Sequence, residues 1–394
     1  MNGMIRVLTL VSLLLGSGFR AFAADTAIET SQISETAALL RQAQDGGQAA
    51  RDAAMAALLA NVEEYQASSS SKGLYENDLK ARLKAIDSVW ALGELGDPRL
   101  MPRLARFYGA ADDVIRMNLL VSMGKLQNKA AALPYLLAVA ADARETAVVR
   151  SVAFEMLGQL GHTEGLPGLA PSRETGIGKG DLIYTGGIVG TVSGWVSPDL
   201  PIGHSGIFAG VETKNGRMNV VIADCVPNNF KPYGGVRNVY SWSDFTHQHK
   251  FPFYGSRTPA VKPTAEQRER IVALGLEMGK KGLRYNDTHF MQKGPVEFDC
   301  VGYTEYVYEA AGLNPTPNSY ETGLGWPLTP YEQFISGKPS TPARGAAERP
   351  AFSAAAAPDR AILLRGAASL AGAFGLAVPQ PAEVAAEVLP SRAD

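Results

Sequence analysis

The sequence predicts an all-α domain followed by an α+β domain, and three observations lead to this prediction. Residues 30–171 are rich in Ala and Leu, and Gly93, Gly124 and Gly158 recur there in similar surroundings at spacings of 31 and 34 residues. Residues 178–330 begin with short strand-like runs separated by Gly and Asn turns, and helical periodicity returns later in this segment. Residues 331–394 are rich in Pro and Ala, which is typical of a linker and tail.

The repeated element is an apolar residue followed by Gly, any residue and Leu, with an apolar-Pro pair nine or ten residues after the glycine. Its copies are Leu92–Leu95, Met123–Leu126 and Leu157–Leu160. A fixed period with punctuating Gly and Pro indicates stacked helical hairpins. The segment resembles short HEAT-like repeats, and residues 36–65 are expected to form a degenerate N-terminal cap. Because this module has no catalytic constellation, we expect it to dock a protein partner or hold the chain near its substrate.

The charge of the chain argues against one class of partner. The 394 residues carry a net charge of −2, and 19% of them are charged. This length is sufficient for two or three domains with a large core. Since no basic excess is present, nucleic acid is not an expected partner.

The N-terminus has the features of a signal peptide over residues 1–23. Arg6 precedes an apolar run, and Ala21-Phe22-Ala23 has the small-x-small pattern of a cleavage site. The run is too short for a permanent membrane anchor. The apolar tail from Ala361 to Val378 contains Arg365 and three glycines, so we expect a docking helix or a poorly ordered tail there. The mature protein is therefore predicted to be periplasmic or secreted.

A cysteine at a predicted helix start is the most informative chemical feature. Cys300 opens an amphipathic helix that is expected to end at Gly312. The positive end of a helix dipole stabilises a thiolate. His204 lies between two glycines in a predicted strand, where a substrate could approach closely. Together they predict a nucleophilic pair, with Cys300 attacking a carbonyl and His204 as its general base.

Asp224 is the predicted third member, because a carboxylate that accepts from the imidazole would fix its tautomer. It lies in the predicted strand Met218–Cys225, after an Asn215-Gly216 turn. A tight two-residue turn would place His204 on the face of Cys225 instead, whereas one bulge or an odd-length loop would return it to the face of Asp224. Since Cys225 and Cys300 are the only cysteines, a disulfide between them is the alternative.

Four elements of the sequence resemble the NlpC-type cell-wall cysteine peptidases of the papain-like superfamily. Their order is swapped relative to the usual one, which is similar to the circularly permuted branch that contains YiiX-like proteins and lecithin–retinol acyltransferase relatives. The resemblance covers about residues 178–320 and implies a circularly permuted papain-like α+β domain. The elements are Gly180-Asp181-Leu182, His204-Ser205-Gly206-Ile207-Phe208, Tyr285, and Phe298-Asp299-Cys300-Val301-Gly302.

The resemblance implies acyl transfer to water through a thioester, without a cofactor or metal, on amide bonds of peptidoglycan stem peptides. It also implies that Tyr285 lies near the oxyanion site. Two departures from the family are Val301, where Ser is common, and Asn286, where Trp is common; the second would alter a substrate subsite. Two alternatives therefore stay open: a lipid amidase or acyltransferase, as among other permuted members, and a non-catalytic protein-interaction scaffold.

Other polar residues are expected to be peripheral. His247 and His249 form a His-x-His pair, but no third ligand at a suitable spacing accompanies them, so we expect a solvated loop. His289 is expected near the mouth of the cleft. Glu305 and Glu309 are expected on the solvated side of the cysteine helix.

Overall fold

The computed structural model describes residues 35–72, 79–166, 177–186, 202–228, 234–286, 293–317 and 328–339. The predicted signal peptide, the tail and His289 lie outside these residues. Among the helices of the described residues, none is long and apolar enough to cross a membrane.

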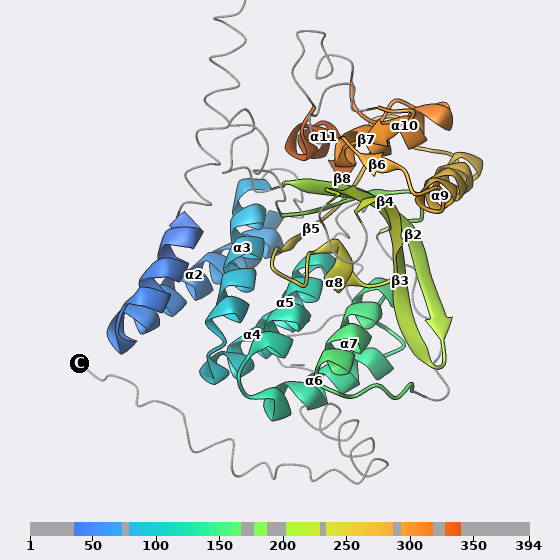
Figure 1. Ribbon diagram of the computed structural model, residues 1–394. Helices are drawn as coiled ribbons and strands as arrows, with labels where there is room; N and C mark the ends of the chain where they lie inside the picture. Colours follow the sequence, from blue (N-terminus) through green and yellow to red (C-terminus); the bar gives the residue numbers. More distant parts are fainter. Residues whose placement is uncertain are drawn as a thin grey trace, which may run out of the picture.

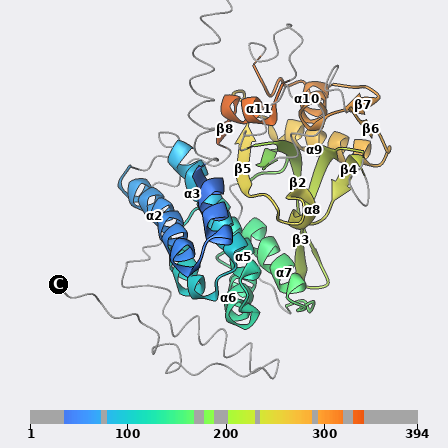
Figure 2. The ribbon, with the colours of Figure 1, turned by 60° about the vertical axis from the view of Figure 1, so that its left-hand side comes forward.

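Helices α2 to α7 form an all-α module, which we call the repeat module (Figure 1). Helices α3, α5 and α7 stack in order and face the sheet, and we call them the inner helices (Figures 1 and 2). Side chains of Asp112, Asn128 and Thr146 accept hydrogen bonds from the first turns of α5, α6 and α7, which fixes where these helices begin. After helical residues 35–45, the helices are α2 (Gln48–Lys72), α3 (Leu79–Leu95), α4 (Met101–Ala110), α5 (Asp113–Lys125), α6 (Lys129–Ala141) and α7 (Ala147–Gln159), with a 3-10 turn at Pro98–Leu100.

The repeated glycines lie where successive inner helices approach each other. A Cβ atom on Gly93 of α3 would lie 2.8 Å from the Cα of Ser122 in α5. One on Gly124 of α5 would lie 2.4 Å from the Cε of Met156 in α7. The glycine period in the sequence therefore reflects the close contact between helices of neighbouring repeats.

Arg217 of the sheet closes the stack where a fourth repeat would continue it. Its Nη2 would lie 3.2 Å from a Cβ on Gly158, the third repeated glycine. The guanidinium stacks on the ring of Phe154 at 5.3 Å and donates to the carbonyl of that residue. It also donates to the carbonyls of His162 and Glu164, each at 3.1 Å. The carbonyls of His162 and Glu164 follow the last inner helix, and the sheet supplies a partner to both.

Gly93→Ala is expected to destabilise the protein by about 1–2 kcal/mol, because the clash with Ser122 backbone outweighs the ~1 kcal/mol by which Ala favours a helix. The matched control is Gly109→Ala in α4, where an added Cβ meets no atom within 4 Å. That variant is expected to gain a few tenths of a kcal/mol, up to about 1. Urea unfolding of both variants checks this, and equal shifts would contradict the role given to the glycine.

The second domain is built on a six-stranded antiparallel sheet of order β4-β3-β2-β1-β5-β8. Helices α9 and α10 cover one face, where a Cβ on Gly275 of α9 would touch Ile207 and Ala223. Helix α8 and the repeat module cover the other face (Figure 2). There Trp242 stacks on Phe208 and donates to Ser151 of α7. The strands are β1 (Leu182–Thr185), β2 (His204–Lys214), β3 (Arg217–Val226), β4 (Gly235–Val239), β5 (Phe253–Thr258) and β8 (Lys338–Pro339).

The remaining elements follow the sequence in the main. Thr264 caps α9 in a capping box. The chain continues beyond residue 330, where we expected the domain to end, because it returns to pair β8 with the edge of β5. The elements are α8 (Trp242–Phe245), α9 (Ala265–Gly279), α10 (Cys300–Ala310), α11 (Pro330–Ser336) and the parallel pair β6 (Arg284–Tyr285) and β7 (Glu297–Phe298).

Buried polar side chains of the inner helices bind the backbone of β5. Asn118 donates to the carbonyl of Phe253 at 2.7 Å and accepts from its N–H at 3.0 Å. The hydroxyl of Tyr254 donates to Asp87 of α3 at 2.5 Å. Because each group is withdrawn from water, these bonds tie the two domains together in a defined register.

The stability of the protein is expected to fall between about pH 4 and pH 7 because of Asp87. Burial raises the pKa of this carboxyl from 3.8 to about 7, while the bond from Tyr254 acts in the opposite direction. Between these values the unfolded chain has lost the proton that the folded chain keeps, so raising the pH favours unfolding. The full effect corresponds to roughly 4 kcal/mol. In Asp87→Asn this slope should disappear, which urea unfolding at pH 5 and pH 8 would show; parallel pH dependence in both proteins would refute it.

Candidate active site

A buried chain of three polar side chains crosses strands β2, β3 and β4. His204 Nε2 lies 3.0 Å from Asp224 Oδ2. Arg237 donates to both oxygens of the same carboxylate, from Nε at 2.8 Å and from Nη2 at 3.1 Å. His204 is 1% exposed and Asp224 0%. Together with Cys300, these three residues are called the candidate site below.

A β-bulge brings His204 and Asp224 to the same face of the sheet. Asn215-Gly216 is a two-residue turn with positive φ at both positions, and Lys214 pairs with Arg217 beside it. The register then shifts between Phe208 and Gly210, so Gly206 rather than Ile207 lies opposite Asp224. The shift returns the imidazole to the carboxylate face, which is the bulge alternative predicted from the sequence.

The ion pair with Arg237 determines which nitrogen of His204 can act as a base. Burial alone would raise the pKa of Asp224, but the charge of Arg237 and the bond from His204 hold it well below its usual range. An ionised carboxylate only accepts hydrogen bonds, so Nε2 of His204 must be the donor. In the neutral imidazole, Nδ1 therefore carries the lone pair that can take a proton.

Cys300 is the first residue of α10, and Asp299 caps the helix by accepting from the N–H of Gly302 at 2.7 Å. The thiol receives a backbone hydrogen bond at Ser205, the residue that follows His204. The structure thus brings the thiol to the start of β2. Both side chains belong to described residues, and no hydrogen bond joins the thiol to the imidazole. Catalytic hydrogen bonds often tighten only when the substrate binds.

The helix terminus does not by itself make Cys300 a thiolate. Burial raises the pKa of the thiol well above its usual range, and the neighbouring Asp299 carboxylate adds to the increase. Backbone hydrogen bonds at Ser205, Val301 and Cys300 itself lower the pKa but do not offset the burial. The resting thiol is therefore protonated at neutral pH and needs a base to lose its proton.

The two cysteines are both free, so the predicted alternative of a disulfide is wrong for this structure. Cys225 is fully buried, and its thiol donates to the carbonyl of Phe298 at 3.2 Å. Burial raises the pKa of Cys225 well above its usual range. This cysteine is a core residue beside the candidate site.

Tyr285 lies next to the segment that leads into Cys300. It pairs with Phe298 across strands β6 and β7, two residues before the nucleophile. Its N–H donates to Asn228 Oδ1 at 2.9 Å, and its carbonyl accepts from Asn228 Nδ2 at 3.0 Å. The backbone of Tyr285 is therefore fixed beside Cys300, and its phenol as an oxyanion donor stays a prediction.

Several residues expected at the surface are buried, and one residue of the site was missed. His247 and His249 are 7% and 3% exposed and do not form a solvated loop: His247 packs against the rings of His204 and Phe251, and the carbonyl of His249 accepts from Trp90 of the repeat module. Glu305 is fully buried and accepts from Gln333 of α11 at 2.7 Å, whereas Glu309 is exposed as expected. One signal in the sequence could have identified Arg237: it is a single arginine in a short strand that also contains two valines.

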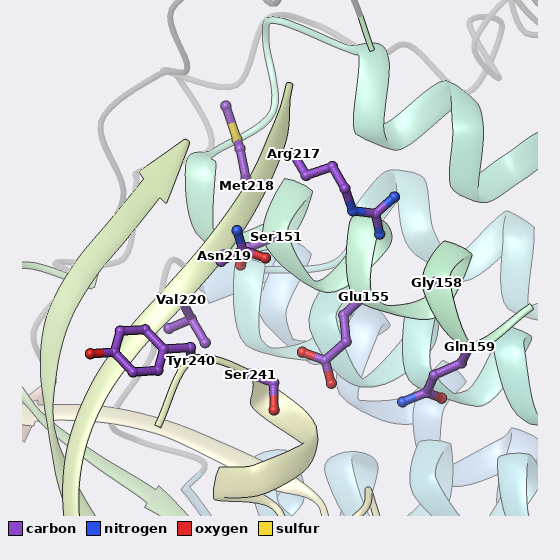
Figure 3. Close-up of a pocket in the computed structure, with 10 residues that line it drawn as sticks. All are labelled: Ser151, Glu155, Gly158, Gln159, Arg217, Met218, Asn219, Val220, Tyr240 and Ser241. Carbon is purple, nitrogen blue, oxygen red and sulfur yellow. The ribbon is translucent and has the colours of Figure 1, made fainter. Parts of the chain in front are cut away.

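A cavity of about 320 Å³ lies between α7 and β3, at the boundary of the two domains (Figure 3). Glu155 projects into this region from α7 toward the segment that starts at Ser241, and Asn219 lies on the facing strand (Figure 3). None of the candidate-site residues lines this cavity. In the described part of the chain, no three His, Cys, Asp or Glu side chains are grouped to hold a metal ion.

Comparison with known proteins identifies the first domain only. No curated protein and no solved structure matches the chain. Residues 74–158 match the family of HEAT repeats, which agrees with the stacked helical hairpins seen in the structure. The chain thus carries an N-terminal region of HEAT repeats followed by an α+β region with an antiparallel sheet.

Proposed function

We propose that this protein is a cysteine hydrolase in which Cys300 is the nucleophile and His204, oriented by Asp224, is the general base. The observation that carries the proposal is the buried His204–Asp224–Arg237 chain, together with the Cys300 thiol, which accepts a hydrogen bond from the backbone of Ser205, the residue after His204. A structural histidine needs no ionised partner that is itself held by an arginine. Such a device is suited to fixing a tautomer and stabilising an imidazolium.

The chemistry follows from the protonation states. Because the resting thiol is neutral, His204 Nδ1 takes its proton as sulfur attacks the substrate carbonyl. The imidazolium that forms is stabilised by Asp224, and it then protonates the leaving amine. Water hydrolyses the resulting thioester with His204 again as the base. The N–H of Cys300 and the phenol of Tyr285 are the proposed donors to the oxyanion.

The resemblance to permuted NlpC-type enzymes supports amide bonds of peptidoglycan stem peptides as the substrate, and the predicted signal peptide supports a periplasmic or secreted location. A lipid amidase or acyltransferase of the permuted branch would use the same residues. The resemblance to papain-like enzymes belongs to the proposal and rests on the motifs around His204 and Cys300.

Trapping of the acyl-enzyme tests the proposal. The mature protein is mixed with stem-peptide fragments or, separately, with N-acyl and O-acyl lipids. The reaction is then quenched in acid, and the mass of the protein is measured by mass spectrometry. A hydroxylamine-sensitive adduct on Cys300, absent in Cys300→Ser and present in Cys225→Ser, supports a cysteine hydrolase, and the substrate that forms it identifies the class. Turnover that survives in Cys300→Ser would refute the proposal.

A further inference from the structure

A left-handed turn carries a second histidine to the candidate site. His247, Gln248 and His249 have φ values of 53°, 61° and 56°, a left-handed backbone region that residues other than glycine rarely adopt. The ring of His247 lies 5.5 Å from that of His204, centroid to centroid. The ring of Phe245 lies 5.3 Å from the same imidazole. The ring of His204 is therefore bounded by two aromatic side chains from one short segment.

The repeat module holds this turn through His249. The carbonyl of His249 accepts from Trp90 Nε1 of α3 at 3.3 Å and from Lys125 Nζ of α5 at 2.5 Å. Its Nε2 lies 2.9 Å from Glu155 Oε1 of α7. All three inner helices thus contribute one polar side chain to a single buried residue.

Glu155 fixes the start of the same segment. Its carboxylate accepts from the N–H groups of Trp242 and Ser243, each at 2.6 Å, at the first turn of α8. A strained backbone persists only where the surroundings determine it from several sides. Here those surroundings are the inner helices, which therefore keep both ends of the 242–249 segment in place.

We propose that the repeat module sets the geometry of the candidate site by holding the 247–249 turn, which makes His247 a positioning residue for His204. The inference rests on the proposed function. It adds a role for the repeats within the protein itself, because the inner helices bind the turn that contacts His204. Burial, with a smaller contribution from the charge of His204, lowers the pKa of His247 to about 3. His247 is thus neutral at physiological pH and adds no repulsion when His204 becomes an imidazolium.

The groups that face His204 come from three other parts of the fold. They are the carboxylate of Asp224 on β3, the guanidinium of Arg237 beyond it on β4, and His247 on the turn. Asp224 holds Nε2, and the rings of His247 and Phe245 restrict rotation of the imidazole. Without the turn, the direction of Nδ1 is no longer fixed, and an error of about 1 Å in such a group can cost up to 100-fold in rate.

The pH dependence of Cys300 alkylation by iodoacetamide in the full chain separates the roles. We expect the alkylation rate of Cys300 to be constant around neutral pH, because His204 takes the proton of the thiol there. At alkaline pH the rate should rise again as the thiol itself ionises. These two parts of the profile are called the plateau and the alkaline limb. His204→Asn should remove the plateau only. His247→Gln and Lys125→Met should each lower the plateau about tenfold and leave the alkaline limb unchanged. Cys225, which is fully buried, must stay unmodified and reports that each variant is folded.

Lys84→Met is the matched control. Lys84 lies on the repeat module with 22% of its side chain exposed, against 19% for Lys125. Its substitution removes one ion pair, with Glu35. It does not touch the turn, so its plateau should equal that of the wild type. A plateau that His247→Gln and Lys125→Met leave unchanged, or that Lys84→Met lowers equally, overturns the inference and leaves the proposed function standing. A wild-type profile without a plateau that depends on His204 overturns both.

Discussion

Asp224→Asn is expected to lower kcat for hydrolysis by about 10³- to 10⁴-fold while KM changes little. The amide of Asn can donate to Nε2 of His204, which would favour the tautomer with its proton on Nδ1. The imidazole would then present a donor to Cys300 where the reaction needs a base. Steady-state kinetics on the substrate that forms the thioester measures the effect.

The controls for this prediction are variants of the other proposed catalytic residues and of the second cysteine. Cys300→Ser and His204→Asn should each lower kcat by about 10³-fold or more, and combining either with Asp224→Asn should add little, because the three residues act as a unit. Cys225→Ser removes the other thiol and should retain activity. Independent, additive losses for Asp224→Asn and His204→Asn would show that the carboxylate acts elsewhere.

Arg237→Met is expected to destabilise the protein by about 3–5 kcal/mol at pH 7, because it leaves the Asp224 carboxylate buried without its cation. Arg237 helps to hold the pKa of Asp224 well below its usual value. A lowered pKa means that the pair stabilises the fold above about pH 4 and that this stabilisation is lost as the pH falls through the folded-state pKa. The loss in free energy of unfolding caused by Arg237→Met should therefore be largest at neutral pH and smaller in acid. Denaturant unfolding from pH 3 to pH 7 measures both features.

Arg144→Met provides the comparison for an exposed ion pair. Arg144 lies 2.8 Å from Asp142, but 66% of its side chain is exposed. Water screens such a pair, so the loss should stay below about 1 kcal/mol. If Arg237→Met cost no more than Arg144→Met, Asp224 would not depend on its cation in the folded protein.

Local signals in the sequence were sufficient for much of the fold. The spacing of Gly93, Gly124 and Gly158 predicted stacked helices, because the first two lie at close contacts between successive inner helices and the third at the end of the stack. The prediction that Cys300 opens a helix matches the start of α10. These features depend on neighbours a few residues apart or on a strict period, so a single sequence contains them.

Features that depend on distant segments were not predictable in the same way. The bulge at residue 209, which decides whether His204 can meet Asp224, has no signal in the hairpin turn itself. Burial of His249 depends on Trp90 and Lys125, more than a hundred residues earlier in the chain. Burial also reverses the effect expected of the helix terminus on Cys300, since desolvation of the thiol outweighs the dipole.

The position of Arg217 has a consequence for the order in which the chain folds. Repeat arrays usually gain structure from contacts that are close in sequence, so they can form while synthesis continues. Here the last inner helix ends at Gln159, but the side chain that binds the carbonyls just after its end, those of His162 and Glu164, lies in β3, beyond the β2 strand. The array is thus completed only after the first hairpin of the sheet has left the ribosome. The growing chain must wait for a later segment before its earliest domain is finished.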